Sequence, residues 1–438
     1  MPGSATDRSR WCAVLALTLA IVGGASMLYY HLALFVPRAL EVNAERGLGN
    51  GYAFGSDFYP VWLCARMWRL RQIDPYSPEM TRQIQTGLFG RPLDPHIPSD
   101  PPVNYGKFAY PAQTLLLLWP AGFLDFPKLR LALAVLLPLL TAGGICFWLR
   151  ALDWPVGIPW FAALVILSLC NYPVLEALFA EQPGLIVGVL LALAALALRR
   201  DRLFLAGVLT SLTLIKPQMT ILATIYLLLW SMADRHRVRF LAGFLATSLT
   251  LLGASLWIWP RWIGEWLLVV VRYRGYATPP LVAFLLGKYV APVATVVLLL
   301  AGGIVAWQGR RASPQSDDFW LALSLLLAIS CIVLLPGQAI YDHIVLLPGI
   351  FLILRCRRAL GATGPVARIL MMLGAALLVW PWMAAFALIA VRPWLQPGLF
   401  YSPEVFALPL RTTAALPFAV LALLALAVRL ARRGAAAV

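Results

Sequence analysis

Long apolar runs recur along the whole chain, from Trp11 to Val428, and short polar pieces separate each run from the next. A helix needs about 20 predominantly apolar residues to cross the hydrocarbon core of a bilayer. The first run, Trp11–Val36, follows Arg8 and Arg10 as the apolar part of a signal peptide would, but it is too long for one. The pattern therefore predicts an all-α, polytopic membrane protein whose first helix is a retained signal anchor.

Arginine lies in short clusters between the apolar runs, and such clusters mark cytoplasmic loops. The clusters are Arg199–Arg202, Arg235–Arg239, Arg310-Arg311, Arg355–Arg358 and Arg429–Arg433. Placing all of them inside gives twelve crossings, both termini in the cytoplasm, and one integral membrane domain over residues 1–438. The stretch Tyr110–Leu149 has the length of two helices, broken at Phe126-Pro127-Lys128, but must cross an odd number of times. One of its two helices is therefore expected to be re-entrant.

Composition agrees with a membrane protein and excludes a soluble globular domain. Of 438 residues, 61% are hydrophobic and 12% are charged, whereas soluble domains carry about 25% charged residues. The mean hydropathy is +0.81. The net charge of +16 comes largely from the arginine clusters, so it does not indicate nucleic acid as a partner. We expect a bacterial inner (plasma) membrane protein.

Polar residues other than arginine concentrate in the pieces that this topology leaves outside. These are residues 37–109, 171–184, 216–218, 260–280, 336–342 and 392–403. The first of them, Pro37–Ala109, is a long exterior loop with two expected helices. Val61–Gln72 carries an apolar face and arginines on another, which predicts a helix lying at the membrane interface. Pro78–Leu88 is a second, weakly amphipathic helix, and Pro92–Pro102 is expected to be an ordered loop.

Asp57 stands just before the first of these helices and allows two compatible interpretations. It, or Ser56, caps a helix that starts at Phe58, with Pro60 in the first turn. It is also placed to act as a general base toward a hydroxyl group of an acceptor. An enzyme or a receptor with its chemistry on one face fits this arrangement. A transporter would instead hold polar groups near the middle of the membrane.

Several short stretches, taken together and in order, resemble glycosyltransferase family 87. They are Ser56–Tyr59, Asp74-Pro75-Tyr76, Phe108–Pro111, Glu181–Gly184, Leu205-Ala206-Gly207, Ile215–Gln218 and Tyr341-Asp342-His343. The chain departs from the family pattern at Tyr110-Pro111-Ala112, where Tyr-Pro-Pro is usual, and at Glu181-Gln182-Pro183, where Asn-Gly-Gln is frequent. With these departures, the resemblance specifies the fold more closely than the substrate.

The resemblance implies a GT-C-like fold with about twelve transmembrane helices and interfacial helices in the first exterior loop. It implies a hexosyltransferase that moves a mannose-like sugar from a polyprenyl-phosphate donor to a lipid or glycan acceptor, with inversion and on the periplasmic face. In such enzymes a carboxylate of the first exterior loop is catalytic, and here that residue is Asp57. The leaving phosphate needs cations. Lys216, Arg272 and Arg274 are the first candidates, followed by Lys107 and Arg392.

The remaining candidate residues are assigned to substrate binding, each beside a structural alternative. Lys216 either pairs with phosphate or extends to the membrane surface. Arg272 and Arg274 either grip phosphate or face anionic lipid. His343 either donates to the substrate or is a hydrogen-bonded structural residue, and Glu181 either binds the sugar or caps Gln182–Leu198. The motif residues Gln182, Tyr110 and Asp342 complete the predicted site.

No cofactor is predicted, and no metal-ligand spacing is visible. If a divalent metal does bind, Asp57, Glu181 and Asp342 are the carboxylates to consider first. Two other function classes remain open from the residues alone. One is a transporter or flippase of a lipid-linked glycan, and the other is a non-catalytic assembly protein of the cell envelope. The lack of a Walker motif argues against an ATPase.

Overall fold

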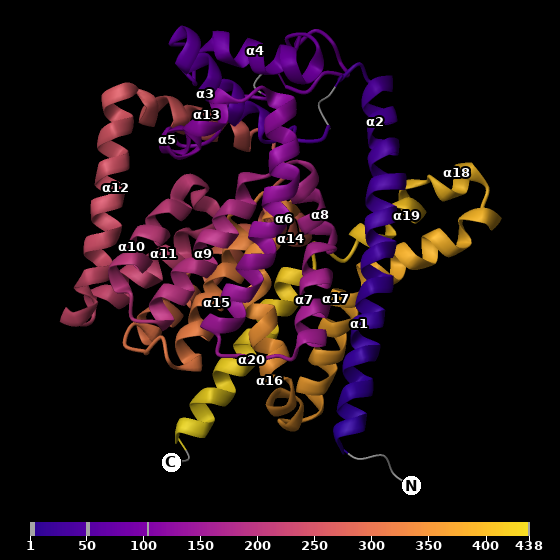
Figure 1. Ribbon diagram of the computed structural model, residues 1–438, viewed down its shortest axis with the longest axis vertical. Helices are drawn as coiled ribbons and strands as arrows, with labels where there is room; N and C mark the ends of the chain where they lie inside the picture. Colours follow the sequence, from indigo (N-terminus) through magenta and orange to yellow (C-terminus); the bar gives the residue numbers. More distant parts are fainter. Residues whose placement is uncertain (1–4, 50–52, 103–104, 437–438) are drawn as a thin grey trace.

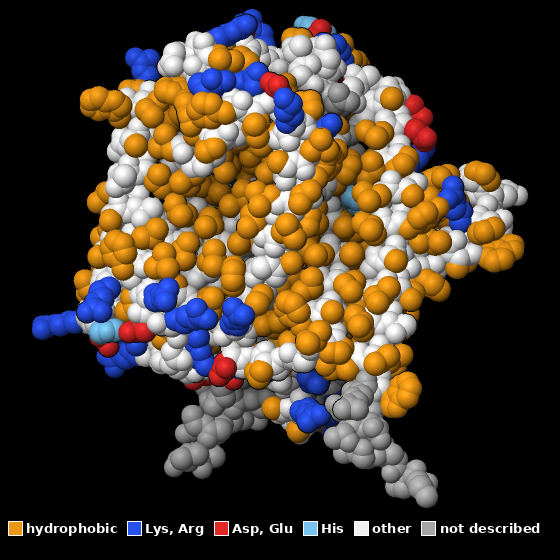
Figure 2. All heavy atoms as spheres, in the orientation of Figure 1, with side chains coloured by type: hydrophobic (Ala, Val, Ile, Leu, Met, Phe, Trp, Pro, Cys, Tyr) orange, Lys and Arg blue, Asp and Glu red, His pale blue; other side chains and the backbone are white. Residues whose placement is uncertain are grey.

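The computed structural model describes residues 5–49, 53–102 and 105–436. Over these residues the chain forms helices joined by loops, with one isolated bridge between Pro280 and Pro336 and no β-strand. On the face drawn in Figure 2, hydrophobic side chains form a broad band, while Lys and Arg gather at the two ends of the molecule. The all-α class is therefore confirmed, and a membrane-spanning protein is indicated.

The twelve predicted crossings are not confirmed. Five stretches of the described chain are long and apolar enough to span a membrane: Trp11–Glu45, Phe126–Ala151, Arg235–Ile258, Leu281–Gly309 and Pro365–Trp394. A sixth is α7 (Ile158–Leu169) with α8 (Tyr172–Phe179), bent by 61° at the break between them. The other apolar runs also fall on helices, but these are shorter. At 1.5 Å per residue, the 17 residues of α9 (Pro183–Arg199) reach only about 25 Å.

The first helix is unusual in its middle. It runs without a break through α1 (Ala5–Tyr29), η1 (Tyr30–Phe35) and α2 (Val36–Glu45). The η1 segment is a π-helix, a wider turn that is rare and is frequently found at functional sites. The helix continues past the bundle toward the upper end of Figure 1.

The upper end of Figure 1 carries a group of short helices that we call the cap. It consists of α3 (Tyr59–Arg71), α4 (Pro78–Phe89), α5 (Gln113–Leu118), η2 (Trp119–Phe123) and α13 (Trp262–Arg274) with their loops. The two helices predicted for the first exterior loop are thus present almost as expected. Val61, Cys64 and Ala65 of α3 are buried, and the Ser77 side chain accepts from the Met80 N–H to cap α4. The loop after α4 is held by a paired contact of Arg91 with Asp100.

The stretch predicted to hold one re-entrant helix divides two residues earlier than expected. The chain breaks at Leu124 and Asp125, and α6 (Phe126–Ala151) begins there with Pro127 in its first turn. Proline fits a first helical turn because its missing N–H would have no partner there. Only α6 is long enough to cross, while α5 and η2 pack against α3 in the cap.

The bundle below the cap is built around α15 (Asp317–Val333), whose side chains are buried from Phe319 to Val333. Around it lie α10 (Leu203–Leu212), η3 (Thr213–Ile215), α11 (Pro217–Met232), η4 (Arg235–Arg237), α12 (Val238–Ile258), α14 (Leu281–Gly309), η5 (Ile340–Leu346), α16 (Leu347–Ala362), α17 (Pro365–Val391) and α20 (Leu416–Ala436). A side arm of η6 (Arg392–Trp394), α18 (Pro397–Phe400), α19 (Pro403–Phe406) and η7 (Leu408–Leu410) projects from it (Figure 1).

Two glycines allow α10 and α12 to approach closely. A Cβ atom on Gly207 would lie 2.0 Å from the Phe240 carbonyl oxygen, and one on Gly243 would lie 2.1 Å from the Phe204 carbonyl oxygen. Such contacts between backbones need small residues, as is common where membrane helices cross.

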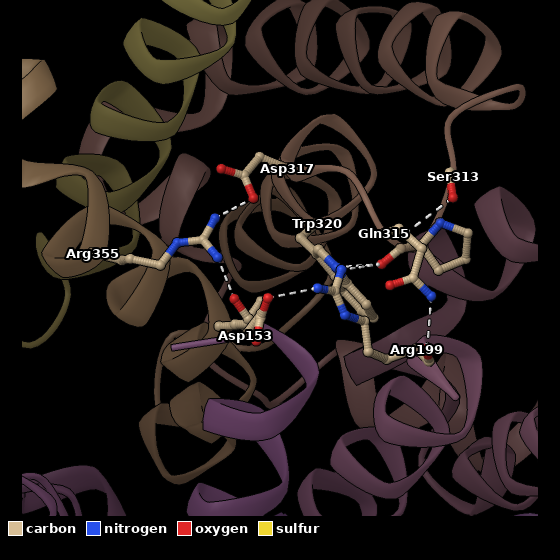
Figure 3. A network of polar contacts seen from close by, with 9 residues as sticks. Asp153, Arg199, Ser313, Gln315, Asp317, Trp320 and Arg355 are labelled. Atoms are coloured by element: carbon tan, nitrogen blue, oxygen red, sulfur yellow. Dashed lines mark hydrogen bonds and ion pairs between the residues drawn. The ribbon is translucent and has the colours of Figure 1, made fainter. Parts of the chain in front are cut away.

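A polar network ties several segments together at the end of the molecule where both termini lie (Figures 1 and 3). Arg199 of α9 bonds to Asp153 Oδ2 at 3.0 Å and to the Pro314 carbonyl at 3.1 Å. Arg355 of α16 bonds to the Leu152 carbonyl and to Asp317. We call this group the basal network. It joins the α6–α7 loop, α9, the start of α15 and α16.

Candidate active site

Four segments that are far apart in sequence bring their polar side chains together beneath the cap. The Gln182 amide nitrogen donates to Asp57 Oδ2. Lys216 Nζ donates to Gln182 Oε1 at 3.0 Å and to Asp342 Oδ1 at 2.6 Å. Each residue comes from a different piece that the sequence topology placed outside. The structure thus joins four of the nine predicted site residues in one chain of contacts, which we call the central network.

Asp57 is fixed by the turn between α8 and α9. The N–H groups of Gly55 and Asp57 donate to the carbonyl oxygens of Phe179 and Ala180, at 2.9 and 3.1 Å. The expected capping role is wrong, because α3 has Phe58 as its N-cap residue and no side chain bonds to the helix start. The Asp57 carboxylate instead accepts from the Gln182 amide, and its role as a general base stays a prediction.

Lys216 enters the site because the chain cannot remain helical there. The ring of Pro217 disfavours the α conformation at the residue before it, and Lys216 accordingly has φ −136° and ψ 73°, between η3 and α11. Its side chain is buried, with 6% exposed, so it does not extend to a lipid surface. The Nζ atom also lies 4.9 Å from the ring centre of Tyr341.

The pair of Lys216 and Asp342 is a buried ion pair with little free space around it. A Cβ atom on Gly184 would lie only 2.4 Å from Asp342 Oδ1 and 3.4 Å from Lys216 Nζ. Removing one partner of such a pair leaves an uncompensated buried charge, which typically costs about 3–5 kcal/mol. The other carboxylate oxygen of Asp342 is buried and makes no hydrogen bond to the described protein atoms.

Glu181 is buried beside the network but is not bonded into it. Its backbone is left-handed, with φ +53°, and neither of its carboxylate oxygens has a hydrogen-bond partner among the described atoms. The expected capping role is not seen, because α9 has Gln182 as N-cap and no side-chain cap. Burial raises the pKa of Glu181 to about 8, against the charge of Arg130.

The other predicted site residues lie around this centre at different depths. His343 is buried with 6% exposed, and its Nδ1 atom has no partner among the described atoms. The Tyr110 carbonyl accepts from the Tyr76 hydroxyl at 2.7 Å. Arg272 and Arg274, in the last turn of α13, are exposed and are not part of the central network. The nine predicted residues therefore belong partly to the buried centre and partly to an exposed rim, which is formed by Arg272 and Arg274.

A cluster of tyrosines lies beside that rim, and Tyr273 stands between Arg272 and Arg274 in the sequence. The ring of Tyr273 lies 5.2 Å from that of Tyr276, which in turn lies 5.8 Å from the ring of Tyr105. The Gln338 amide donates to the Tyr273 hydroxyl at 3.2 Å. The charge of Asp57 contributes to the raised pKa values of Tyr105 and Tyr273, after the larger effect of burial, so these rings lie within electrostatic range of Asp57.

The environment of Asp57 makes its carboxylate more basic than usual. Burial raises the pKa of Asp57 to about 6, opposed by the positive charge of Lys216 and reinforced by the negative charge of Glu176. A carboxylate with a pKa near 6 can both accept a proton and remain ionised at neutral pH.

Within the described residues, no group of three His, Cys, Asp or Glu side chains could hold a metal ion.

A groove of about 240 Å³ opens next to the site. Its lining is mainly apolar, with the Gln338 amide at one side, and the residues are Thr278, Leu281, Phe284, Gly337, Gln338, Ile340, Leu410, Thr413 and Ala414. Ile340 lies two residues before Asp342, so the groove and the central network share the η5 segment.

Residues 108–336 match glycosyltransferase family 87, just over half of the chain. The chain belongs to glycosyltransferase family 87. No curated protein and no solved structure matches it. As a family 87 member, the protein is a membrane glycosyltransferase, which is not the class of a transporter or an assembly protein. The match includes Gln182, Lys216 and Arg272, while Asp57 and Asp342 lie on either side of it.

This glycosyltransferase contains a second pair of ionisable side chains that was not predicted from its sequence. His31 Nε2 and Glu176 Oε2 lie 2.9 Å apart, and His31 is fully buried within the first helix. A signal was available, because an ionisable residue inside an apolar run is functional by default. His31 interrupts the run Trp11–Val36, and Glu176 follows the run of α7.

Proposed function

We propose that the protein transfers a hexose, mannose-like, from a polyprenyl-phosphate donor to a lipid or glycan acceptor at the periplasmic face, with inversion. Asp57 is the general base. The observation that carries this proposal is the position of the Asp57 carboxylate, which accepts from the Gln182 amide nitrogen and is linked through Gln182 to the Lys216–Asp342 pair. Its pKa is raised to about 6.

In this reaction Asp57 acts directly on the acceptor. A carboxylate oxygen of Asp57 removes the proton of an acceptor hydroxyl while the hydroxyl oxygen attacks the anomeric carbon. The new glycosidic bond forms on the face opposite the leaving group, which inverts the configuration. The bond from the anomeric carbon to the phosphate oxygen breaks, and the polyprenyl phosphate departs with the electron pair.

The exposed arginines of the rim are better placed than Lys216 to neutralise the leaving phosphate. Lys216 already shares its charge with Asp342 at 2.6 Å, so we assign it mainly to orienting Gln182 and Asp342. Arg272 and Arg274 are exposed at the end of α13. Burial lowers the pKa of the half-buried Lys107, and the charge of Arg272 adds to this effect. Cations close enough to repel each other are stabilised by an anion between them.

The isoprenoid part of the donor would enter the apolar groove of about 240 Å³ beside Ile340. This groove includes Thr278, four residues after Arg274, so a phosphate at the rim and an apolar chain in the groove can belong to one molecule. Glu181, His343, Tyr110 and Asp342 are then left to bind the hydroxyl groups of the sugar. The unbonded buried oxygens of Glu181 and Asp342 support this assignment.

The experiment is an assay of purified Asp57→Asn with a polyprenyl-phosphate hexose donor. Loss of a general base typically lowers the rate about 10²–10⁴-fold. Asparagine keeps an oxygen that can accept from the Gln182 amide, so the variant should express and melt like the wild type.

The matched control is Asp125→Asn, which makes the same chemical change at the start of α6. Asp125 is 61% exposed in a surface ion pair with Arg66, and such pairs contribute only about 0–1 kcal/mol to stability. We expect wild-type turnover in this control. Near-wild-type turnover of Asp57→Asn would exclude Asp57 as the base.

A further inference from the structure

The pair of His31 and Glu176 places two ionisable side chains in hydrogen-bond contact where such groups are seldom found. His31 sits in the π-helical segment η1 of a helix long and apolar enough to span a membrane, and its side chain is fully buried. Glu176 of α8 has only 13% of its side chain exposed, and the two side chains are 2.9 Å apart. Ionisable groups in this setting are expensive and usually functional.

The surroundings of His31 hold its ring in one orientation. The ring stacks on Phe35 with centres 5.9 Å apart and meets Tyr172 and Phe179 edge-on at 5.8 Å each. The π-helical turn is a rare conformation, and it ends at Phe35, one of these contacts. A histidine fixed on three sides fixes the carboxylate to which it bonds.

The backbone places Glu176 close to Asp57. The Ala180 carbonyl accepts the N–H of Asp57 at 3.1 Å, while the Ala180 N–H donates to the Glu176 carbonyl at 2.9 Å. Glu176 and the anchor of Asp57 are therefore one helical turn apart, about 5.4 Å along the axis. The negative charge of Glu176 accordingly acts on Asp57.

We propose that His31 and Glu176 form a positioning pair for Asp57, in which His31 fixes the Glu176 carboxylate and Glu176 presents a fixed negative charge to the base. The proposal rests on the proposed function, since it assumes that Asp57 removes the acceptor proton. When Asp57 takes this proton its own charge disappears, and its repulsion with Glu176 is relieved. Glu176 thus favours the transition state over the ground state.

Other charged groups also face Asp57 and must be kept in place in any test. Lys216 lowers its pKa, and Asp342 raises it. Tyrosines whose pKa values the charge of Asp57 helps to raise complete the surroundings, namely Tyr105, Tyr110, Tyr273 and Tyr341. The test variants leave all of these groups unchanged, so a shift in the pH profile reports the Glu176 charge.

The experiment compares the pH dependence of kcat/KM for wild type, Glu176→Gln and the double variant His31→Gln/Glu176→Gln. Removing a nearby negative charge lowers the pKa of the base. We expect the acid limb to move to lower pH by on the order of one unit. Because the base is weaker and less well placed, the pH-independent value of kcat/KM above this limb should fall by up to about 10²-fold.

The double variant separates positioning from folding. Glutamine at both positions leaves no buried charge without a partner, and the two amides can bond to each other. This variant should therefore melt close to the wild type while it keeps the shifted limb. The matched control is Glu41→Gln on α2, which removes an exposed carboxylate of the same continuous helix. We expect the wild-type profile from it.

An unmoved acid limb in the folded variants would overturn the proposal, whatever their plateau rates. Failure of both variants to fold would equally overturn it, because the pair would then be an anchor between α1 and α8. These outcomes differ from failure of the proposed function, which would show as turnover in Asp57→Asn. If Asp57→Asn is inactive but Glu176→Gln leaves the acid limb of the pH profile unmoved, the proposed function stands and only the positioning pair is rejected.

Discussion

Asp57 owes its position to residues outside its own helix. Its loop is tied by backbone bonds to the turn after α8, and its carboxylate accepts from the Gln182 amide. A carboxylate held in this way does not depend on the helix start that follows it. Substitutions in α3 should therefore affect stability more than the chemistry at Asp57.

The raised pKa of Asp57 predicts the pH dependence of transfer. Burial raises this pKa to about 6, so the carboxylate is protonated below that pH and cannot accept a proton. The value of kcat/KM should rise through about pH 6 and fall about tenfold per unit below it, as for one essential base. The proposed polyprenyl-phosphate hexose donor would be a phosphodiester, and a phosphodiester does not titrate in this range. An acid limb near pH 4, the value of an exposed aspartate, would contradict the prediction.

At the residue scale, the sequence identified the members of the central network but not their partners. Asp57 stands out as a carboxylate before an interfacial helix, Lys216 as a lysine between two apolar runs, and Gln182 and Asp342 as members of the family motifs. The contact of Lys216 with Asp342 joins positions 126 residues apart, and no local spacing encodes it. The same limit explains why Asp57 and Glu181 were expected to cap helices. A cap is a local contact, whereas the contacts of Asp57 are distant in sequence.

At the scale of elements, apolar runs located the helices but not the number of membrane crossings. The helices α3 and α4 lie almost where amphipathic spacing placed them. A run such as Leu203–Ile215 ends where Pro217 prevents a helical Lys216, and the resulting helix is too short to count as a span by itself. Hydropathy shows that a segment is apolar enough to be buried. The length of the helix, and so its ability to span the membrane, is set by breaks at proline.

The crossing of α10 and α12 predicts a strong effect of one methyl group. In Gly207→Ala the new Cβ atom would lie 2.0 Å from the Phe240 carbonyl oxygen, so the two helices must separate. Overpacking of this kind typically costs about 1–3 kcal/mol. We expect a lower melting temperature of the detergent-purified protein, measured by thermal unfolding.

Gly253→Ala is the matched control, because Gly253 lies on α12 and has no atom within 4 Å of an added Cβ. Alanine at such a site should be neutral or stabilising by about 0.5–1 kcal/mol. Equal melting temperatures for the two variants would show that the glycine contact does not set the spacing of these helices.

At the scale of the whole molecule, the central network lies beneath the cap, and both termini lie at the opposite end (Figure 1). The basal network and several arginine clusters are on the termini side. This polarity agrees with the expected topology, in which arginine marks the cytoplasmic side. The side of the membrane itself stays a prediction.

Labelling of single cysteines tests this prediction. In a Cys12→Ser background, which removes the exposed native cysteine, we would introduce Ser99→Cys in the loop after α4 or Arg235→Cys in η4. A membrane-impermeant maleimide on intact spheroplasts should label Ser99→Cys only, because its loop is expected to be periplasmic. Arg235→Cys should react only after the membrane is opened. The reverse pattern would invert the orientation and place the site in the cytoplasm.

The basal network has a consequence for the evolution of the family. Many of its donors bond to main-chain carbonyls, as Arg199 does to Pro314 and Arg355 to Leu152. A carbonyl is present whatever residue carries it, so the loops that accept these bonds can change their side chains freely. The arginines cannot, since lysine lacks their planar pair of donors. In an alignment of relatives, we expect Arg199 and Arg355 to be retained while Leu152 and Pro314, which contribute only carbonyl oxygens to these bonds, drift.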